Sequence, residues 1–296
     1  MRLRLSQREA LWAFAFLVIP LAFFLYFRIL PAFQALWLSF YQWHTDPSQR
    51  NFVGLEHYAR LLDDPLLQRA LWNTLLYTLL GVPAQIGLGL SLALLLRAVP
   101  WGRELFRAIY FAPYITPAVA VAWVWSWMLS PHFGLVNELL SLLGIPPQPF
   151  LQSPAQALPT VTGVVVWQNL GFQIVLFLAG LESIPRQYYE AARIDGAEGF
   201  QLFRYITWPL LNPVLVFSVV IGTIGYLQLF TQVVNLNFTD QGGPLNSTLT
   251  LALYIYQLAF LRFQLGYAAA VTVLLFAIIL FITLLQLKIL TRRVEL

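Results

Sequence analysis

Long apolar runs that are almost free of charge limit the fold of this chain more than any other feature. Several of them reach or exceed the roughly 20 residues that a helix needs to cross the ~30 Å hydrocarbon core of a bilayer. Only 10% of the 296 residues are charged and 59% are hydrophobic, whereas an ordinary soluble domain carries about 25% charged residues. The chain cannot cover itself with a charged surface. The sequence therefore predicts an all-α, polytopic membrane protein.

Six membrane-spanning helices are expected. The first apolar run, 9–43, is too long for one simple span, and we expect Pro20 and Pro31 to interrupt it, with Arg28 snorkelling to the far interface. The expected spans are Leu11–Leu30, Leu71–Leu96, Ala108–Leu129, Leu158–Leu181, Leu210–Phe230 and Tyr267–Leu287. They divide the chain into an anchor with an outer segment (1–70), a five-helix core with a polar loop at 183–209 (71–290) and a tail (291–296).

The distribution of lysine and arginine predicts the orientation. With the N-terminus inside, twelve of these residues fall on the cytoplasmic side and five on the outer side, and such a bias in short loops sets topology. The apolar segment 248–263 has only 16 residues and would, as a seventh span, force the basic C-terminal tail outside. We expect it to lie on the outer face or re-enter it. The twelve inner residues are Arg2, Arg4, Arg8, Arg97, Arg103, Arg107, Arg186, Arg193, Arg204, Lys288, Arg292 and Arg293.

The same composition argues against several functions. The net charge of +4 is explained by topology, so nucleic acid is not an expected partner, and no A-x-A site follows the first apolar run, which favours an uncleaved anchor. Spans two to six carry no Asp, Glu, Lys, Arg or His, which argues against a proton relay. The only lysine, Lys288, follows Leu287 and not the glycine of a P-loop, so this chain is not expected to hydrolyse ATP.

Metal and thiol chemistry are also unexpected. There is no cysteine, and the three histidines His44, His57 and His132 lack the spacing of metal ligands. We therefore predict no catalytic residues and no bound metal. Uphill transport by such a chain would need energy from a separate subunit that touches its cytoplasmic face.

A charged stretch, Glu190–Pro209, separates the fourth and fifth spans. Ser183 and Pro185 predict the start of a helix over 185–194. Asp195 and Gly196 are expected to break it, because glycine readily adopts the positive φ of a tight reversal. A second helix is expected over 197–206, with Pro209 ending it and beginning the fifth span. From the pattern alone, this helix–turn–helix is either a docking surface or an amphipathic connector that rests on lipid headgroups.

The stretch resembles a known family. Glu190-Ala191-Ala192, Gly196, Ile206 and Pro209 match the EAA loop of bacterial ABC-importer membrane subunits at the expected spacing, with Trp208 where leucine is frequent. The segments LWLSFYQW, FVGLEHYARLL, PYITPAVAVAWVWSWMLSPHFGLVN and QGGPLNSTLTLALYIYQLAF are similar to the carbohydrate-uptake subgroup. The chain looks most like the first of the two paired permease subunits of the maltose, lactose and glycerol-phosphate type.

This resemblance implies an ABC type I importer permease fold in the plasma (inner) membrane of a prokaryote. It also implies a second homologous permease subunit, two ATPase subunits that bind ATP and Mg, an extracytoplasmic sugar-binding protein, surrounding membrane lipid, and no cofactor bound by this chain. A sugar or polyol would cross by alternating access. The residues that the resemblance assigns to ATPase coupling are Glu190, Ala191, Ala192, Arg193, Asp195 and Gly196.

Uncharged polar residues in spans four and five are candidates for the substrate path. Amides and hydroxyls suit a neutral polyol, and Trp167 or Tyr226 would stack on a sugar ring. The alternative is interhelical hydrogen bonding with glycine at close contacts, and Tyr110, Trp123, Trp125 and Trp127 are expected to be belt or packing residues. Import of polyamine, phosphate or peptide, a passive channel and an intramembrane enzyme are the other functions considered. The path candidates are Asn169, Gly171, Gln173, Tyr226, Gln228 and Gln232.

Overall fold

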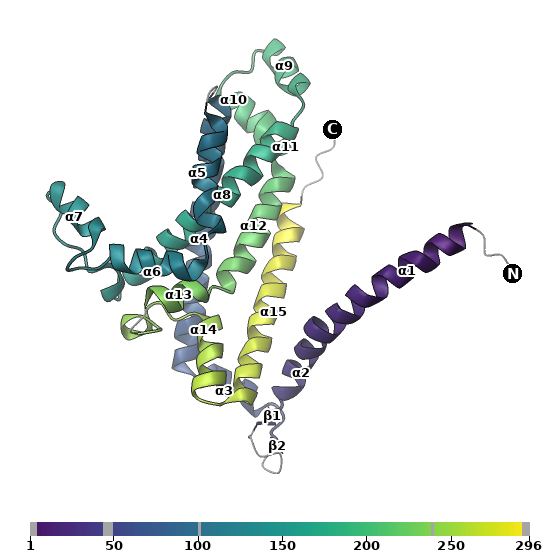
Figure 1. Ribbon diagram of the computed structural model, residues 1–296, viewed down its shortest axis with the longest axis vertical. Helices are drawn as coiled ribbons and strands as arrows, with labels where there is room; N and C mark the ends of the chain where they lie inside the picture. Colours follow the sequence, from purple (N-terminus) through teal and green to yellow (C-terminus); the bar gives the residue numbers. More distant parts are fainter. Residues whose placement is uncertain (1–4, 44–49, 100–101, 238–239, 292–296) are drawn as a thin grey trace. The chain divides into compact units, whose positions relative to one another are not determined.

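The computed structural model describes residues 5–43, 50–99, 102–237 and 240–291, and nearly all of its regular structure is helical (Figure 1). It divides into two units, one made of residues 1–63 and 255–274 and the other of residues 64–254 and 275–296. Of the residues that predict the orientation, Arg2, Arg4, Arg292 and Arg293 lie outside the described ranges.

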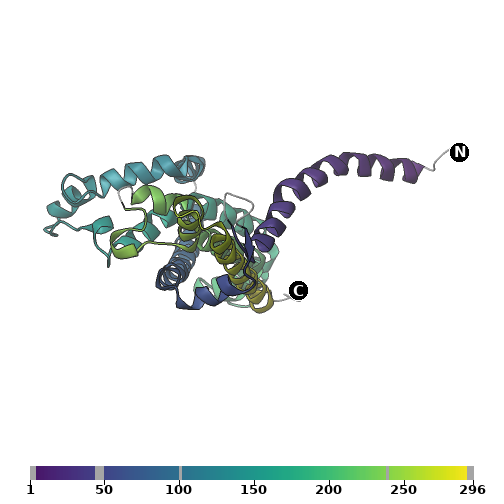
Figure 2. The same ribbon diagram turned by 90° about the horizontal axis from the view of Figure 1, so that it is seen from below.

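The first unit opens with a long curved helical rod (Figures 1 and 2). Pro20 lies inside its first part and Pro31 in the first turn of its last part, so the expectation that these prolines interrupt the helix is wrong. A wider π-helical turn containing Arg28 directly precedes Pro31, and it gives the proline ring room next to the preceding turn. The rod consists of α1 (Leu5–Phe24), η1 (Leu25–Ile29) and α2 (Leu30–Leu38).

The rest of the first unit is short and held by polar contacts. Strands β1 (Tyr41–Gln42) and β2 (Asn51–Phe52) pair antiparallel, and α3 (Glu56–Asp63) follows them. Tyr58 of α3 lies 2.6 Å from the Ser39 hydroxyl, and the Arg60 guanidinium lies 4.0 Å from the ring centroid of Tyr267. The unit also contains η6 (Gln257–Leu261) and the start of α15 (Leu265–Leu290).

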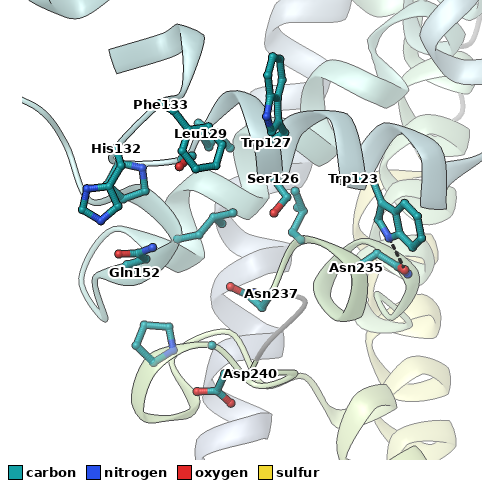
Figure 3. A pocket seen from close by; sticks show the side chains of 16 residues that line it. Trp123, Ser126, Trp127, Leu129, His132, Phe133, Gln152, Asn235, Asn237 and Asp240 are labelled. Atoms are coloured by element: carbon teal, nitrogen blue, oxygen red, sulfur yellow. Dashed lines mark hydrogen bonds between the residues drawn. The ribbon is translucent and has the colours of Figure 1, made fainter. Parts of the chain in front are cut away.

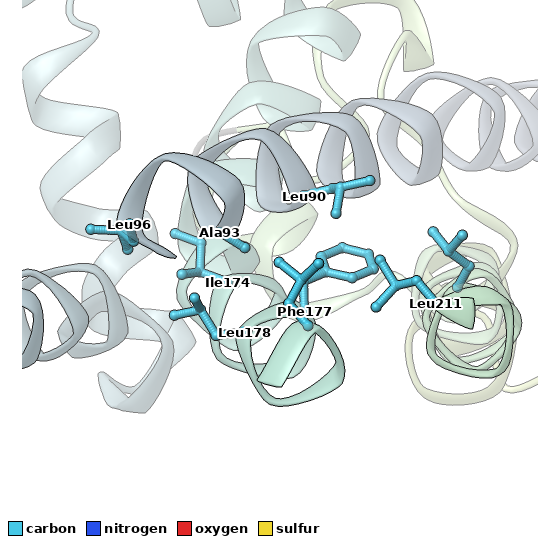
Figure 4. Close-up of a cluster of buried hydrophobic side chains, with 9 residues drawn as sticks. Leu90, Ala93, Leu96, Ile174, Phe177, Leu178 and Leu211 are labelled. Atoms are coloured by element: carbon cyan, nitrogen blue, oxygen red, sulfur yellow. The ribbon is translucent and has the colours of Figure 1, made fainter. Parts of the chain in front are cut away.

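The second unit is built on the packing of α4 (Pro65–Ala98) against α8 (Ala157–Ser183). The carboxylate of Asp64 caps α4 by accepting hydrogen bonds from the backbone N–H groups of Leu66 and Leu67 at 2.9 and 3.1 Å. An apolar cluster at this contact is shown in Figure 4. Leu211 and Leu215 add to it from a later part of the chain, and its α4 and α8 members are Leu90, Ala93, Leu96, Ile174, Phe177, Leu178 and Leu181. Both helices are long and apolar enough to span a membrane, and so is α15.

The third expected span is two helices and not one. α5 (Arg103–Ile115) and α6 (Ala118–Met128) are bent by 96° at a short break. Pro117 restricts the residue before it to extended backbone, and Thr116 has φ −74° and ψ 136°. The single continuous helix predicted over 108–129 is therefore wrong.

The fifth expected span is also broken. The chain passes Pro209 within helical turns and bends by 66° at Leu211, so the prediction that Pro209 ends the preceding helix is wrong. Proline fits there because the π-helical turn Phe203–Thr207 precedes it and gives its ring room next to the preceding turn. The segments are α10 (Phe200–Leu202), η4 (Phe203–Thr207), α11 (Trp208–Leu210), α12 (Asn212–Leu227) and α13 (Thr231–Leu236).

The remaining elements of the second unit are short. The predicted outer segment 248–263 contains one apolar helical stretch, Leu251–Leu261, which is too short to cross a bilayer as a straight helix. Its position relative to the membrane stays a prediction. The other elements are α7 (Leu135–Leu142), η3 (Phe150–Gln152), α9 (Arg186–Ile194), η5 (Pro244–Asn246) and α14 (Leu251–Tyr256).

Glycine allows α5 and α8 to approach closely. A Cβ atom at Gly171 of α8 would collide with the backbone of Tyr110 and Phe111 in α5. Gly163, two helical turns earlier on α8, is exposed and has no atom within 4 Å of such a Cβ. Small residues at helix crossings have this role in membrane proteins.

We therefore expect Gly171→Ala to destabilise the protein by about 1–3 kcal/mol, because α5 and α8 must move apart to admit the methyl group. Gly163→Ala is the matched control, and it should be neutral or slightly stabilising because the same methyl group meets nothing. Thermal unfolding of the detergent-purified protein measures both. Equal melting temperatures for the two variants would show that α5 and α8 are not in close contact.

Candidate functional site

A polar cavity of about 330 Å³ lies in the second unit where α12 ends. Helix α12 stops at Leu227 and α13 begins at Thr231, so residues 228–230 are not helical. This break lies against α8, and Gln85 of α4 and Tyr114 of α5 complete the wall. The full lining is Gln85, Tyr114, Val165, Asn169, Phe172, Gln173, Ile221, Gly222, Gly225, Tyr226, Gln228, Leu229, Phe230, Thr231 and Gln232.

Five of the six residues predicted for the substrate path line this one cavity. Only Gly171 does not, because it faces the backbone of α5. Gly225, Gln228 and Gln232 do not lie on one continuous helix, since the helix breaks between Leu227 and Thr231. The break nevertheless leaves all three on the cavity wall.

The side-chain amides of Asn169, Gln173 and Gln232 are held in place by hydrogen bonds. The Gln173 side-chain carbonyl accepts a bond of 2.7 Å from the Ser218 hydroxyl. The Asn169 amide donates to the Val165 carbonyl at 2.8 Å, which leaves its own side-chain carbonyl available. These bonds fix where the amides present their remaining donors and acceptors, which is what specific recognition of a polar ligand requires.

The amide of Gln232 is tied to the neighbouring helix in the same way. It donates to the Gln168 side-chain carbonyl of α8 at 3.1 Å. Gln228 is exposed at the end of α12. Gln232 is therefore partly committed to holding α13 on α8, whereas Gln228 stands at the break itself.

Tyr226 combines a packing role with an unmet polar group. Its ring packs so closely on α4 that a Cβ atom at Gly81 would overlap it. The Tyr226 hydroxyl is buried and has no hydrogen-bond partner among the described residues. A buried hydroxyl without a partner is costly.

The sequence analysis did not identify Gln85, Tyr114 and Phe172 as residues of the cavity wall. Tyr114 and Phe172 stack with ring centroids 5.2 Å apart and planes 22° apart, and they add an aromatic surface to the cavity. Gln85 is an amide within the otherwise apolar stretch GVPAQIGLGL, a signal that was present in the sequence. Tyr114 and Phe172 are unremarkable in an aromatic-rich sequence, and only the crossing of α5 with α8 brings them together.

The charge of the wall also matters. None of the residues that line the cavity is Asp, Glu, Lys, Arg or His. A charged ligand would lose its hydration here without gaining an ionic partner. The cavity therefore suits a neutral, hydroxyl-rich molecule.

A separate feature of the second unit is the exposed helix α9, which lies beyond the ends of α5 and α10 (Figure 1). Glu190, Ala191 and Arg193 are exposed on it and Ala192 is half-buried. Gly196 has φ +83° and ends the helix as predicted. The backbone N–H of Ala197 donates to the Ala192 carbonyl at 2.9 Å, which closes the turn.

The start of α9 differs from the prediction. Ser183 does not cap it, because its hydroxyl donates to the Gly180 carbonyl of α8 at 2.8 Å. The following helix begins only at Phe200, later than the predicted Ala197, because Gly199 has φ +47° and keeps the chain out of the helix. The charged stretch 190–209 thus contains the end of α9, a turn that is longer than predicted, and helical backbone again from Phe200.

A second cavity, of about 700 Å³, lies between α6 and α13 (Figure 3). The indole N–H of Trp123 donates to the Asn235 side-chain carbonyl at 3.2 Å, and His132 and Asp240 lie on other parts of the wall. Among the described residues there is no group of three His, Cys, Asp or Glu side chains able to hold a metal ion.

Comparisons with known proteins identify the family of this chain. The family model described as "Binding-protein-dependent transport system inner membrane component" matches residues 85–296. The chain is similar to the trehalose/maltose transport system permease protein MalF of Thermococcus litoralis, with 34% identity, covering 97% of this chain and 96% of that protein. It is 38% identical to the lactose transport system permease protein LacF of Rhizobium radiobacter over 83% of this chain and 82% of that protein.

Solved structures agree with the sequence relatives. A bacterial ABC transporter involved in the import of the acidic polysaccharide alginate matches with a TM-score of 0.82 and 26% identity, covering 97% of this chain and 98% of that chain. The apolar helices α4, α8 and α15 belong to this shared fold. The chain is therefore a multi-pass membrane protein that belongs to the binding-protein-dependent transport system inner membrane component family, among its sugar-transport permeases.

Proposed function

We propose that this chain is the permease subunit through which a neutral sugar or polyol enters the cell, and that the cavity at the α12–α13 break is its sugar site. The observation that carries the proposal is the uncharged polar wall of that cavity in a member of a sugar-permease family. Non-helical backbone at membrane depth is tolerated only where it is buried in protein or lines a cavity. In other transporters such helix breaks form substrate sites near the bilayer midplane.

The chemistry of the wall supports a sugar over other solutes. Asn169, Gln173 and Gln228 offer both donors and acceptors, which match the hydroxyl groups of a sugar. The stacked rings of Tyr114 and Phe172 offer an apolar surface for the C–H face of a sugar ring. Because no ionic partner lines the cavity, polyamines and phosphate are poor candidates. One relative among the solved structures is involved in the import of the acidic polysaccharide alginate, whereas the uncharged wall of this cavity favours a neutral cargo.

We infer that six spans cross the membrane with both termini in the cytoplasm. Four helices are long and apolar enough to cross alone, and the two bent pairs raise that number to six if each pair is one span. The positive charges described at the α9 end, among them Arg97, Arg103 and Arg186, support a cytoplasmic position for this end.

We infer further that α9 couples transport to ATP hydrolysis by separate ATPase subunits. Its exposed Glu190, Ala191 and Arg193 are available to a partner, small side chains allow close backbone approach, and Gly196 fixes the turn after them. Asp195, the last residue before that glycine, is exposed as well. A second permease and an extracytoplasmic sugar-binding protein complete the assembly, and a related transporter has been solved with a periplasmic protein that holds an alginate pentasaccharide. Alternating access would then be a rigid-body transition driven through α9.

The coupling role predicts that Glu190→Lys and Gly196→Leu abolish uptake while the protein still inserts in the membrane. The first reverses a charge at the docking surface, and the second strains a residue at φ +83°. Uptake of radiolabelled sugar and membrane abundance are the measurements. Glu198→Lys is the matched control, because Glu198 is exposed in the same loop beyond Gly196. Normal uptake by both test variants would rule out coupling through α9.

The sugar site predicts that Asn169→Ala and Gln228→Ala each weaken uptake by about tenfold, as expected for the loss of a hydrogen bond worth roughly 1–1.5 kcal/mol. ATPase activity stimulated by the binding protein should persist, because α9 is unaltered. Gln286→Ala is the control, since its amide donates to Thr223 and does not line the cavity. If Asn169→Ala and Gln228→Ala transport normally with the same sugar preference, the sugar binds elsewhere.

A further inference from the structure

A third cavity of the second unit lies where the end of α4 meets α9, and its chemistry is the reverse of the sugar cavity. It has a volume of about 560 Å³. Arg97 of α4 and Arg186 and Arg193 of α9 line it, and Glu190 is the only acidic residue on the wall. With three guanidinium groups and one carboxylate, the wall carries a net positive charge and therefore suits an anion.

The arginines of this cavity are not neutralised by carboxylates. Arg103 pairs with Glu182 and Arg107 with Glu104, and neither of these ion pairs involves the cavity. Arg186 and Arg193 are exposed. An anion that entered would therefore not have to displace a carboxylate from these guanidinium groups.

Arg97 is held in position by Tyr189 of α9. Its Nη1 donates to the Tyr189 hydroxyl at 3.3 Å, and its guanidinium carbon lies 5.2 Å from the centroid of the Tyr189 ring. This contact joins the last turn of α4 to α9. An anion bound to Arg97 and Arg186 together would hold the two helices at the same point.

The apolar side chains of the wall indicate which kind of anion the cavity suits. Leu94 lines the cavity one turn before Arg97, and it belongs to a helix that is long and apolar enough to span the membrane. Leu202 adds a second apolar side chain. The cavity therefore has apolar side chains next to its guanidinium groups, at the end of a spanning helix. A free inorganic anion would gain nothing from contact with the apolar side chains. A phospholipid has a phosphate for the guanidinium groups and acyl chains for the apolar side chains.

We propose that this cavity binds the headgroup phosphate of an anionic phospholipid, with Arg97 and Arg186 as its principal contacts. Arginine recognises phosphate through paired hydrogen bonds, and basic pockets on the cytoplasmic side of membrane proteins bind anionic headgroups. The proposal rests on the cytoplasmic position inferred above for α9. A lipid bound by both Arg97 and Arg186 would make the contact between α4 and α9, and so the position of α9, depend on the lipid composition of the inner leaflet.

The test is lipid retention by the intact transport complex, reconstituted in nanodiscs of phosphatidylcholine with phosphatidylglycerol and examined by native mass spectrometry. Arg97→Gln and Arg186→Gln should each lower retained phosphatidylglycerol by about fivefold, the effect of one basic residue near an anionic lipid surface. Arg107→Gln is the matched control, because it removes the same charge from an arginine that pairs with Glu104 outside the cavity. Size-exclusion chromatography confirms that each complex is assembled.

Four outcomes would overturn the proposal. Equal losses in Arg107→Gln and the cavity variants would mean general attraction to the membrane, and undiminished retention in the cavity variants would mean no site. Displacement of the lipid by millimolar inorganic phosphate would show a site for soluble phosphate. Release of the ATPase subunits by Arg97→Gln or Arg186→Gln would show that the arginines hold a protein partner.

The same experiment separates this proposal from the coupling role. Glu190→Lys adds a positive charge to the cavity wall, so it should retain phosphatidylglycerol at least as well as the unaltered protein while its uptake is lost. Normal uptake by Glu190→Lys would refute coupling and leave lipid binding standing. A fall in lipid retention in that variant would overturn the proposed site, because an added cation cannot repel an anionic headgroup.

Discussion

The contact between α4 and α8 is the interaction on which the rest of the second unit depends. Gly89 lets α4 lie directly on Gln173 and Phe177 of α8, since a Cβ atom at this position would collide with the Gln173 side chain. The apolar cluster between the helices then extends towards the cavity, where it gives way to amides. Close packing and hydrogen bonds must hold helices together in a membrane, because lipid is as apolar as the helix surface. The same contact therefore fixes both the bundle and one wall of the proposed sugar site.

The sequence predicted the class of fold and five of the residues on the cavity wall for physical reasons that are local. Long apolar runs must become helices in a bilayer, and a polar amide such as Asn169 or Gln228 in such a run stands out. The breaks were harder to place. Pro20 and Pro31 leave the first helix continuous, whereas Pro117 separates two helices at 96°. Proline alone does not decide between these outcomes, because a π-helical turn gives the Pro31 ring room, whereas Thr116 before Pro117 adopts extended backbone.

The remaining differences arise where contacts join residues that are distant in the sequence. Tyr114 and Phe172 reach the cavity through the crossing of α5 and α8, and Gly171 is used at that crossing and not on the cavity wall. The end of α9 was predictable because one residue, Gly196, determines it. Ser183, in contrast, bonds to its own helix, a choice that the sequence leaves open.

The central claim is that a neutral sugar occupies the cavity at the break after α12, and site-directed labelling tests it most directly. The chain contains no cysteine, so Gln228→Cys introduces a single thiol at the cavity, and Gln201→Cys introduces one at an exposed position of α10 as a control. The rate of modification by a small polar maleimide is measured in the reconstituted complex, with maltose or trehalose and the binding protein present or absent. The account predicts that transported sugar slows labelling at position 228 and leaves position 201 unchanged. Equal labelling rates at position 228 with and without a sugar that the complex transports would contradict it.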